Sequence, residues 1–223
     1  MGKRAVVVMS GGLDSVVLAY HMMDRGFEII PLVFDYGQTN DEEIERAQVI
    51  AEMLGVSLTI ADFQNLENLL ESGLTGGNIG ASGSYQDTFK STFVPNRNAI
   101  LLSIATGFAI SNGIDVVAYG THGTAPGQPS ITPDCTPAFR DQLEQAFRTG
   151  NLGTGPTVQL YAPFILKSKA EIVQLGARLN VPFEQTWSCY RDEEQHCGEC
   201  GACNERKRAF IEAGVLDVTE YET

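Results

Sequence analysis

The chain is poor in basic residues. Lysine and arginine total 15 against 28 aspartates and glutamates, so the formal net charge of the 223 residues is −13. This balance argues against a surface that wraps DNA or RNA, and no nucleic-acid partner is expected. No apolar run approaches the roughly 18 residues of a membrane-spanning helix, and no signal peptide is evident after Met1. The sequence therefore predicts a cytoplasmic protein without a membrane partner.

Cysteine is scarce over most of the chain and then crowded near its end. Four of the five cysteines are Cys189, Cys197, Cys200 and Cys203. Because disulfides are rare in the cytoplasm, this spacing favours a metal over disulfide bonds. Four thiolates make a closed tetrahedral zinc site, which would be structural because it leaves no open position. An iron–sulfur cluster is the alternative, since ferredoxins also carry CxxCxxC runs. His196 could replace one thiolate.

A glycine-rich stretch near the N-terminus separates two apolar segments; it reads Ser10-Gly11-Gly12-Leu13-Asp14-Ser15. The preceding residues 5–9 are predicted to form a buried strand, and an apolar helix follows. Backbone N–H groups at a helix N-terminus favour an anion. The stretch contains no Lys-Ser/Thr pair, which excludes the P-loop of kinases and GTPases. The stretch resembles the SGGxDS pyrophosphate loop of ATP pyrophosphatases, and a turn that only packs is the alternative.

Apolar periodicity predicts an alternation of strands and helices. Strands are predicted at residues 5–9, 29–34, 57–60, 115–119 and 158–161, and helices at 44–54, 99–110, 138–148 and 168–179. Asn40 with Glu43, and Ser168 with Glu171, have the spacing of helix-capping boxes. The alternation predicts an α/β fold, a Rossmann-like doubly wound parallel sheet. Ligands of such sheets bind at the carboxyl ends of strands, where Ser10 and Asp35 lie.

The domain organisation is expected to be simple, because no linker divides the chain. We expect a nucleotide-binding α/β domain of the pyrophosphate-loop (PP-loop) type over residues 1–180. A C-terminal zinc-binding helical segment over residues 181–223 is expected to pack on it.

Motifs along nearly the whole chain resemble the 7-cyano-7-deazaguanine synthase family, the ATP-dependent enzymes of queuosine biosynthesis. Besides the glycine-rich stretch and the cysteine run, they are Tyr36-Gly37-Gln38, Thr92 to Asn98, Pro133-Asp134-Cys135, Lys169 to Ile172, Thr186 to Tyr190 and Arg206. The resemblance implies an adenine nucleotide alpha hydrolase-like fold, a homodimer, structural zinc and a C–N ligase acting on 7-carboxy-7-deazaguanine. In that family the carboxylate is adenylated, ammonia gives the amide, and a second ATP drives dehydration to the nitrile.

The chemistry requires that charge be neutralised on the departing pyrophosphate. Residues 10–15 are predicted to bind ATP through backbone N–H groups and serine hydroxyls, together with Mg²⁺. We predict Asp14, Arg97 and Lys169 as the catalytic residues. Arg97 could instead be a structural ion-pair partner, and Lys169 could be merely solvated.

The predicted substrate-binding residues are Phe93, Arg97, Asn98 and Asp134, which lie in the motifs of the resemblance. Phe93 offers a flat face for a purine-like base, although an aromatic residue after a loop is as often part of the core.

Four positions depart from the pattern of that family: Asn40, Gln128, Thr132 and Thr136 stand where ionisable or larger polar groups are usual. These neutral residues predict slower nitrile formation, with an amide or an amine conjugate accumulating; the alternative is that neighbouring side chains replace the lost groups. One alternative is therefore an enzyme that joins the deazaguanine to an amine of another molecule, such as a protein, and stops at the amide. A further alternative is a non-catalytic nucleotide-binding scaffold.

Overall fold

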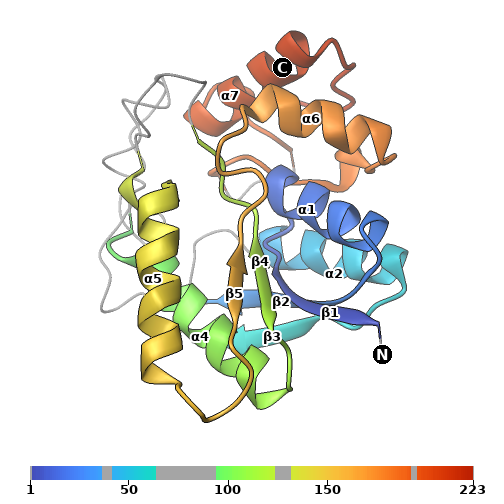
Figure 1. Cartoon of the computed structure of the whole chain (residues 1–223). Coiled ribbons are helices and arrows are strands. Elements are labelled where there is room, and N and C mark those ends of the chain that lie inside the picture. Colours follow the sequence, from blue (N-terminus) through green and yellow to red (C-terminus); the bar gives the residue numbers. More distant parts are fainter. Residues whose placement is uncertain (1, 37–41, 64–93, 124–131, 192–194, 223) are drawn as a thin grey trace.

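The computed structural model describes residues 2–36, 42–63, 94–123, 132–191 and 195–222. A sheet of five strands runs through the centre of the molecule (Figure 1). The strands are β1 (Lys3–Val8), β2 (Phe27–Asp35), β3 (Thr59–Asp62), β4 (Val116–Tyr119) and β5 (Gln159–Tyr161). Every pairing is parallel, and the spatial order is β3-β2-β1-β4-β5. The predicted doubly wound parallel sheet is confirmed.

The centre of the sheet is apolar on both faces, as parallel strands covered by helices require. In β1, Ala5 and Val7 face one core cluster while Val6 faces the other, and all three are fully buried. The strand order reverses on the two sides of β1, so the carboxyl ends of β1 and β4 flank a switch point. Crevices at such points are the usual ligand sites of open α/β sheets.

Helices cover both faces of the sheet. Helices α1 (Leu13–Asp24), α2 (Glu42–Leu54), α6 (Lys169–Arg178) and α7 (Gly201–Ala213) contribute to one cluster, and α4 (Arg97–Ser111) and α5 (Pro137–Gly150) to the other. Helix α7 packs on α6, beyond the carboxyl ends of the strands (Figure 1). Among the described helices, none is both long enough and apolar enough to cross a membrane.

Local sequence signals explain where several helices begin and end. The predicted capping box of α6 is present: Ser168 accepts from the Glu171 N–H at 3.2 Å, and Glu171 accepts from the Ser168 N–H at 2.8 Å. Thr136 caps α5 in the same way, accepting from the Phe139 N–H. Helix α7 ends at Gly214, whose φ of +67° suits glycine. The cap predicted at Asn40 lies outside the described residues.

Candidate active site

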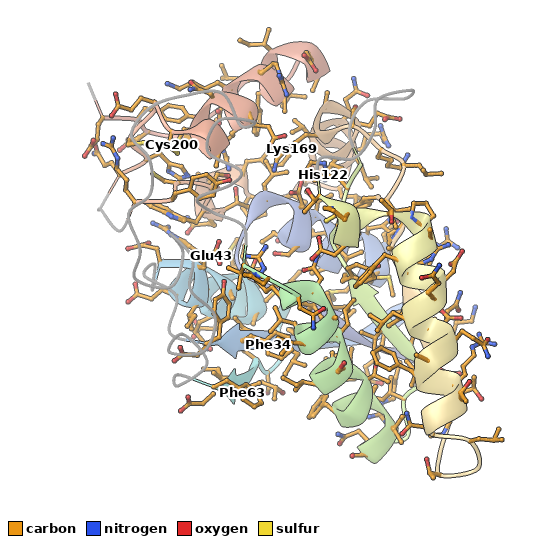
Figure 2. The ribbon with its side chains drawn as sticks, turned by 90° about the vertical axis from the view of Figure 1, so that its left-hand side faces the viewer. Phe34, Glu43, Phe63, His122, Lys169 and Cys200 are labelled. Atoms are coloured by element: carbon orange, nitrogen blue, oxygen red, sulfur yellow. The ribbon has the colours of Figure 1, made fainter. Side chains whose placement is uncertain are left out.

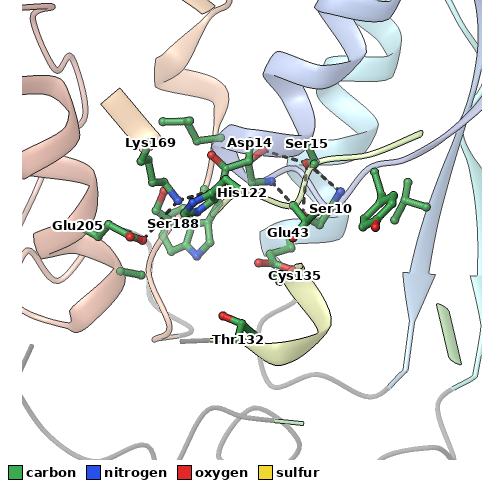
Figure 3. A pocket seen from close by; sticks show the side chains of 18 of the residues that line it. Ser10, Asp14, Ser15, Glu43, His122, Thr132, Cys135, Lys169, Ser188 and Glu205 are labelled. Carbon is green, nitrogen blue, oxygen red and sulfur yellow. Dashed lines mark hydrogen bonds and ion pairs between the residues drawn. The ribbon is translucent and has the colours of Figure 1, made fainter. Parts of the chain in front are cut away.

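A cavity of about 720 Å³ opens where the carboxyl ends of β1, β2 and β4 meet α6 and α7 (Figure 3). Two groups of side chains line it. We call His122, Lys169 and Glu205, with the loop of residues 10–15 beside them, the lysine end. We call the other group the arginine end, which comprises Tyr36, Glu43, Arg97, Asn98, Thr132 and Cys135.

The loop of residues 10–15 is held by its own serines. The Ser15 hydroxyl donates to the Gly12 carbonyl at 2.9 Å and accepts from the Ser10 N–H at 3.1 Å. Gly12 is the N-cap of α1, and no described side chain caps that helix start. The start of α1 is therefore uncapped where its first residues line the cavity, and the positive end of the helix dipole there suits a phosphate.

Gly11 fits the loop against α2. Its φ is +72°, and a Cβ there would lie 2.3 Å from the Glu43 carbonyl oxygen. Gly12 is less constrained, because its added Cβ would meet the Ser10 hydroxyl at 3.2 Å. The first glycine thus supports the packing of the loop, and only the second lines the cavity.

Asp14 organises the lysine end. Its Oδ2 atom accepts from Lys169 Nζ at 2.9 Å and lies 3.6 Å from His122 Nε2. Lys169 also lies 3.6 Å from Glu205 on α7, so one ammonium is shared by two carboxylates (Figure 3). Burial alone would raise the pKa of Asp14, but the neighbouring Lys169, together with His122, holds it below its ordinary value. Burial would lower the pKa of Lys169, whereas the two carboxylates raise it.

The second oxygen of Asp14, Oδ1, is buried and has no hydrogen-bond partner among the described residues. A buried carboxylate oxygen without a partner is costly. Mg²⁺ prefers oxygen ligands and is usually bound through one or two carboxylates and substrate phosphates. Asp14 therefore fits the role of a magnesium ligand beside the loop of residues 10–15.

Arg97 organises the arginine end from the first turn of α4. It hydrogen-bonds the Tyr36 hydroxyl, and the negative charges of Glu43 and Asp134 also face it. Burial would lower the pKa of the guanidinium, but these three groups raise it. Burial raises the pKa of Glu43 to about 7, although Arg97 opposes the shift. A cation and a partly protonated acid thus face the cavity together.

The short 3-10 helix η3 (Pro133–Cys135) closes the arginine end. Asn98 lies with its amide 3.6 Å from the Cys135 sulfur. Burial raises the pKa of the Cys135 thiol, so the sulfur stays protonated near neutral pH. Of the four positions that depart from the family pattern, Thr132 lines the cavity and Thr136 serves as the N-cap of α5. Asn40 and Gln128 lie outside the described residues.

The four clustered cysteines form a separate buried group. The sulfurs of Cys189, Cys197, Cys200 and Cys203 all lie within 4.8 Å of one another. Hydrogen bonds from Cys189 and Cys203 lower the pKa of Cys200, so a thiolate is favoured there. His196 is not part of this group. Its Nε2 atom accepts a hydrogen bond from the Ser188 N–H at 3.1 Å, and its ring contacts that of Trp187 at a tilt of 41°.

The segment that carries the first cysteine also contacts the glycine-rich loop. The Trp187 backbone N–H donates to the Gly11 carbonyl at 3.0 Å, and Trp187 forms a β-bridge with Gly12. Arg206, which is fully buried, donates to the hydroxyls of Thr186 and Ser188 on either side of this tryptophan. The cysteine group is thereby fixed to the lysine end of the cavity.

Most of the residues predicted from the sequence come together. Lining the cavity are Ser10, Gly12, Leu13, Asp14, Ser15, Arg97, Asn98 and Lys169. Gly11 and Asp134 do not line it, although Asp134 influences Arg97. Phe93 lies outside the described residues.

Sequence reasoning missed Glu43, His122 and Glu205, all of which line the cavity. His122 lies three residues after the end of the strand predicted at residues 115–119, so the strand-end rule could have found it. The sequence offered Glu43 only as a capping residue. No local signal marked Glu205, which lies on α7.

Comparison with known families gives one match over nearly the whole chain. The family described as queuosine biosynthesis protein QueC matches residues 4–214. A 7-cyano-7-deazaguanine synthase of Rhizobium rhizogenes is 46% identical over 98% of this chain and 92% of its own length. The synthase of a Marinomonas species is 39% identical over 100% of both chains.

Among solved structures, the chain is similar to the U34-tRNA thiolase NcsA from Methanococcus maripaludis with its 4Fe-4S cluster. The TM-score is 0.50 and the identity 16%, over 94% of this chain and 64% of that chain. At this identity the likeness supports the fold alone.

Proposed function

The chain belongs to the QueC family, and we propose that it is an ATP-dependent ligase that converts 7-carboxy-7-deazaguanine into 7-cyano-7-deazaguanine. One observation carries the proposal: a single cavity contains the phosphate-binding loop, Lys169 and Arg97, in a chain whose relatives are 7-cyano-7-deazaguanine synthases. The names of those relatives favour the complete reaction over a conjugating enzyme or a scaffold.

In the first step the substrate carboxylate attacks the α-phosphorus of ATP, and pyrophosphate leaves. Such a step depends on positioning and on neutralising the phosphate oxygens. The N–H groups at the start of α1 and the hydroxyl of Ser10 are placed to bind the leaving pyrophosphate, and Lys169 supplies a positive charge. Arg97 is suited to hold the substrate carboxylate, because its guanidinium can bind two carboxylate oxygens at once.

In the second step ammonia attacks the carbonyl carbon of the acyl adenylate, and AMP leaves with one oxygen of the original carboxylate. The product is the amide. A second ATP then adenylates the amide oxygen, and loss of AMP and a proton gives the nitrile. Each nitrile therefore costs two ATP and yields two AMP and two pyrophosphates.

Mg²⁺ is the expected companion of ATP in this site. Asp14 and the phosphates would hold it, because Asp14 Oδ1 is buried without a described partner. When bound, such an ion supplies positive charge to the phosphates during transfer.

We infer that the cysteine group holds one structural zinc. A tetrahedral site with zinc–sulfur bonds of about 2.3 Å places its sulfurs about 3.8 Å apart. The described sulfurs, all within 4.8 Å of one another, match one ion. A four-iron cluster places several atoms between its ligands and needs a wider spacing.

We further propose an organisation into residues 1–180 and a zinc-binding segment 181–223 packed on them. The contact of α7 with α6 and the bond from Trp187 to Gly11 support that packing. A homodimer and a cytoplasmic location are likewise proposed from the family.

Mass spectrometry of the products tests the function. The purified protein is incubated with ATP, Mg²⁺, 7-carboxy-7-deazaguanine and ammonium. We expect AMP, pyrophosphate and the nitrile. ADP with phosphate as the nucleotide products, or an amide that never proceeds to nitrile, would contradict the proposal.

A further inference from the structure

Glu43 lies in the first turn of α2 among three acidic residues, the others being Glu42 and Glu45. A carboxylate in the first turn of a helix interacts favourably with the helix dipole, and any of the three residues can provide it. Glu42 pairs with Arg46 at 3.2 Å and does not line the cavity. Glu43 does line it (Figure 3). The helix alone therefore does not account for the placement of Glu43.

The surroundings of Glu43 combine charge with apolar surface. Burial raises its pKa, and the charge that opposes the shift is Arg97 on α4. No hydrogen bond joins the Glu43 carboxyl to a described residue. Val33, Phe34 and Leu101 line the same cavity with apolar side chains, which suit a flat ring. Figure 2 shows the two side chains, Phe34 on β2 and Glu43 on α2.

The proposed substrate carries two different recognition groups on one ring system. Its carboxylate needs a cation, and its guanine-type edge presents two adjacent donors, the ring N1–H and the 2-amino group. A carboxylate has two oxygens that accept in parallel, and paired charge-assisted hydrogen bonds of this kind are strong and specific. Arg97 and Glu43 present these complementary charges in one end of the cavity.

We propose that Glu43 selects the deazaguanine ring by accepting hydrogen bonds from its N1–H and 2-amino groups. The proposal rests on the proposed function for the identity of the substrate, and it adds the residue that determines specificity. Adenine is the other base that must enter the cavity. Its corresponding edge offers one donor and one acceptor, so an ionised carboxylate would bind one atom and repel the other. Glu43 therefore favours the deazaguanine over the base of ATP.

Two substrates and two variants test this. Pyrophosphate release is measured with 7-carboxy-7-deazaguanine and with the same acid lacking the 2-amino group. The wild-type protein should prefer the first by about 10- to 100-fold in kcat/KM, because the analogue leaves a buried acceptor unpaired. In Glu43→Gln, kcat/KM for the amino substrate should fall by a similar factor and the preference should shrink below about threefold. The KM for ATP should stay within about twofold.

Glu42→Gln is the matched control, since it removes a neighbouring carboxylate that does not line the cavity. It should keep the wild-type preference. If Glu43 only positioned Arg97, both acids would lose the same factor in Glu43→Gln, and that result would overturn the proposal. A raised KM for ATP with an unchanged preference would overturn it as well.

Two further outcomes are distinguishable. If the wild-type protein forms no AMP from either acid, the proposed function fails and the inference fails with it. If it turns over both acids equally well, only the inference fails. Should Glu43→Gln not fold, Glu43→Asp keeps the charge and withdraws both oxygens by one methylene. The preference should then fall while the KM for ATP is unchanged, and an intact preference would contradict the role.

Discussion

The two ends of the cavity are built in different ways. At the lysine end, six consecutive residues run from the turn after β1 into the first turn of α1, and Asp14 pairs with Lys169 at 2.9 Å. The arginine end has no such motif. Its groups come from the end of β2, from α2, from α4 and from η3. Arg97 interacts electrostatically with Tyr36, Glu43 and Asp134, and so connects these segments. The lysine end is suited to the phosphates of ATP, which many enzymes bind. The arginine end is suited to one particular acid.

This difference predicts which property each end controls. The phosphate of ATP takes part in every turnover, so damage to the lysine end should stop all chemistry. The arginine end is proposed to bind the acid, so changes there should alter the choice of acid and leave the use of ATP intact. The cysteine group is fixed to the lysine end through Trp187, so disruption of the cysteine group should impair the lysine end.

The largest effect is expected from the metal site. Cys200→Ser should lose the metal and lower the free energy of unfolding by several kcal/mol, since binding a structural zinc contributes on the order of 10 kcal/mol in small modules. Metal analysis and thermal unfolding measure this. Cys135→Ser is the control, because Cys135 is outside the group and should keep one zinc per chain. Well-folded Cys200→Ser with no metal, or iron with sulfide in the wild type, would contradict the assignment.

Lys169→Gln should reduce pyrophosphate release by about 100- to 1,000-fold, because it removes the buried positive charge that pairs with Asp14 beside the loop of residues 10–15. Steady-state kinetics with 7-carboxy-7-deazaguanine and with its analogue lacking the 2-amino group should show the same loss, because the lysine end is expected to act on ATP and not on the acid. Lys167→Gln is the matched control: Lys167 pairs only weakly with Glu171, is 40% exposed and does not line the cavity. Unimpaired turnover in Lys169→Gln would remove this lysine from the mechanism.

Arg97→Gln should raise the KM for the acid by about 10- to 100-fold, the cost of losing charge-assisted hydrogen bonds. The KM for ATP should change little, in contrast to any change at the lysine end. Arg148→Gln, an exposed change on α5, should leave both constants unaltered. If Arg97→Gln weakened ATP and the acid equally, the division of the cavity into two ends would be wrong.

The smallest effect concerns stability at the arginine end. The pKa of Glu43 rises on folding from its ordinary value of 4.5 to about 7. Between these values the folded chain holds more protons than the unfolded one, so stability falls as the pH rises through this window and is then constant. Glu43→Gln removes the penalty and should stabilise the protein by about 1–2 kcal/mol at pH 8, after allowing for solvent screening of a partly exposed group. At pH 4 the difference should vanish. Thermal unfolding at both pH values measures it, and equal effects at both would contradict the shifted pKa.

The lysine end could be predicted from the sequence because its signals are local. An apolar strand, two glycines and a helix start are read in one stretch, and Lys169 lies within a recognisable capping box, between Ser168 and Glu171. The strands were predicted to within about two residues, since periodicity reflects burial on a sheet. The arginine end depends on which helix faces which strand end. Glu43 has the spacing of a capping residue, and only the packing of α2 against Gly11 shows that it lines the cavity.

The central claim is that the protein activates the acid by transferring its carboxylate oxygens to AMP. The direct measurement uses 7-carboxy-7-deazaguanine labelled with ¹⁸O in both carboxylate oxygens, with ATP, Mg²⁺ and ammonium, followed by mass spectrometry. The account predicts two AMP for each 7-cyano-7-deazaguanine, each AMP carrying one ¹⁸O, and an unlabelled nitrile. One labelled AMP per turnover with ¹⁸O retained in an amide, or label appearing in phosphate, would contradict it.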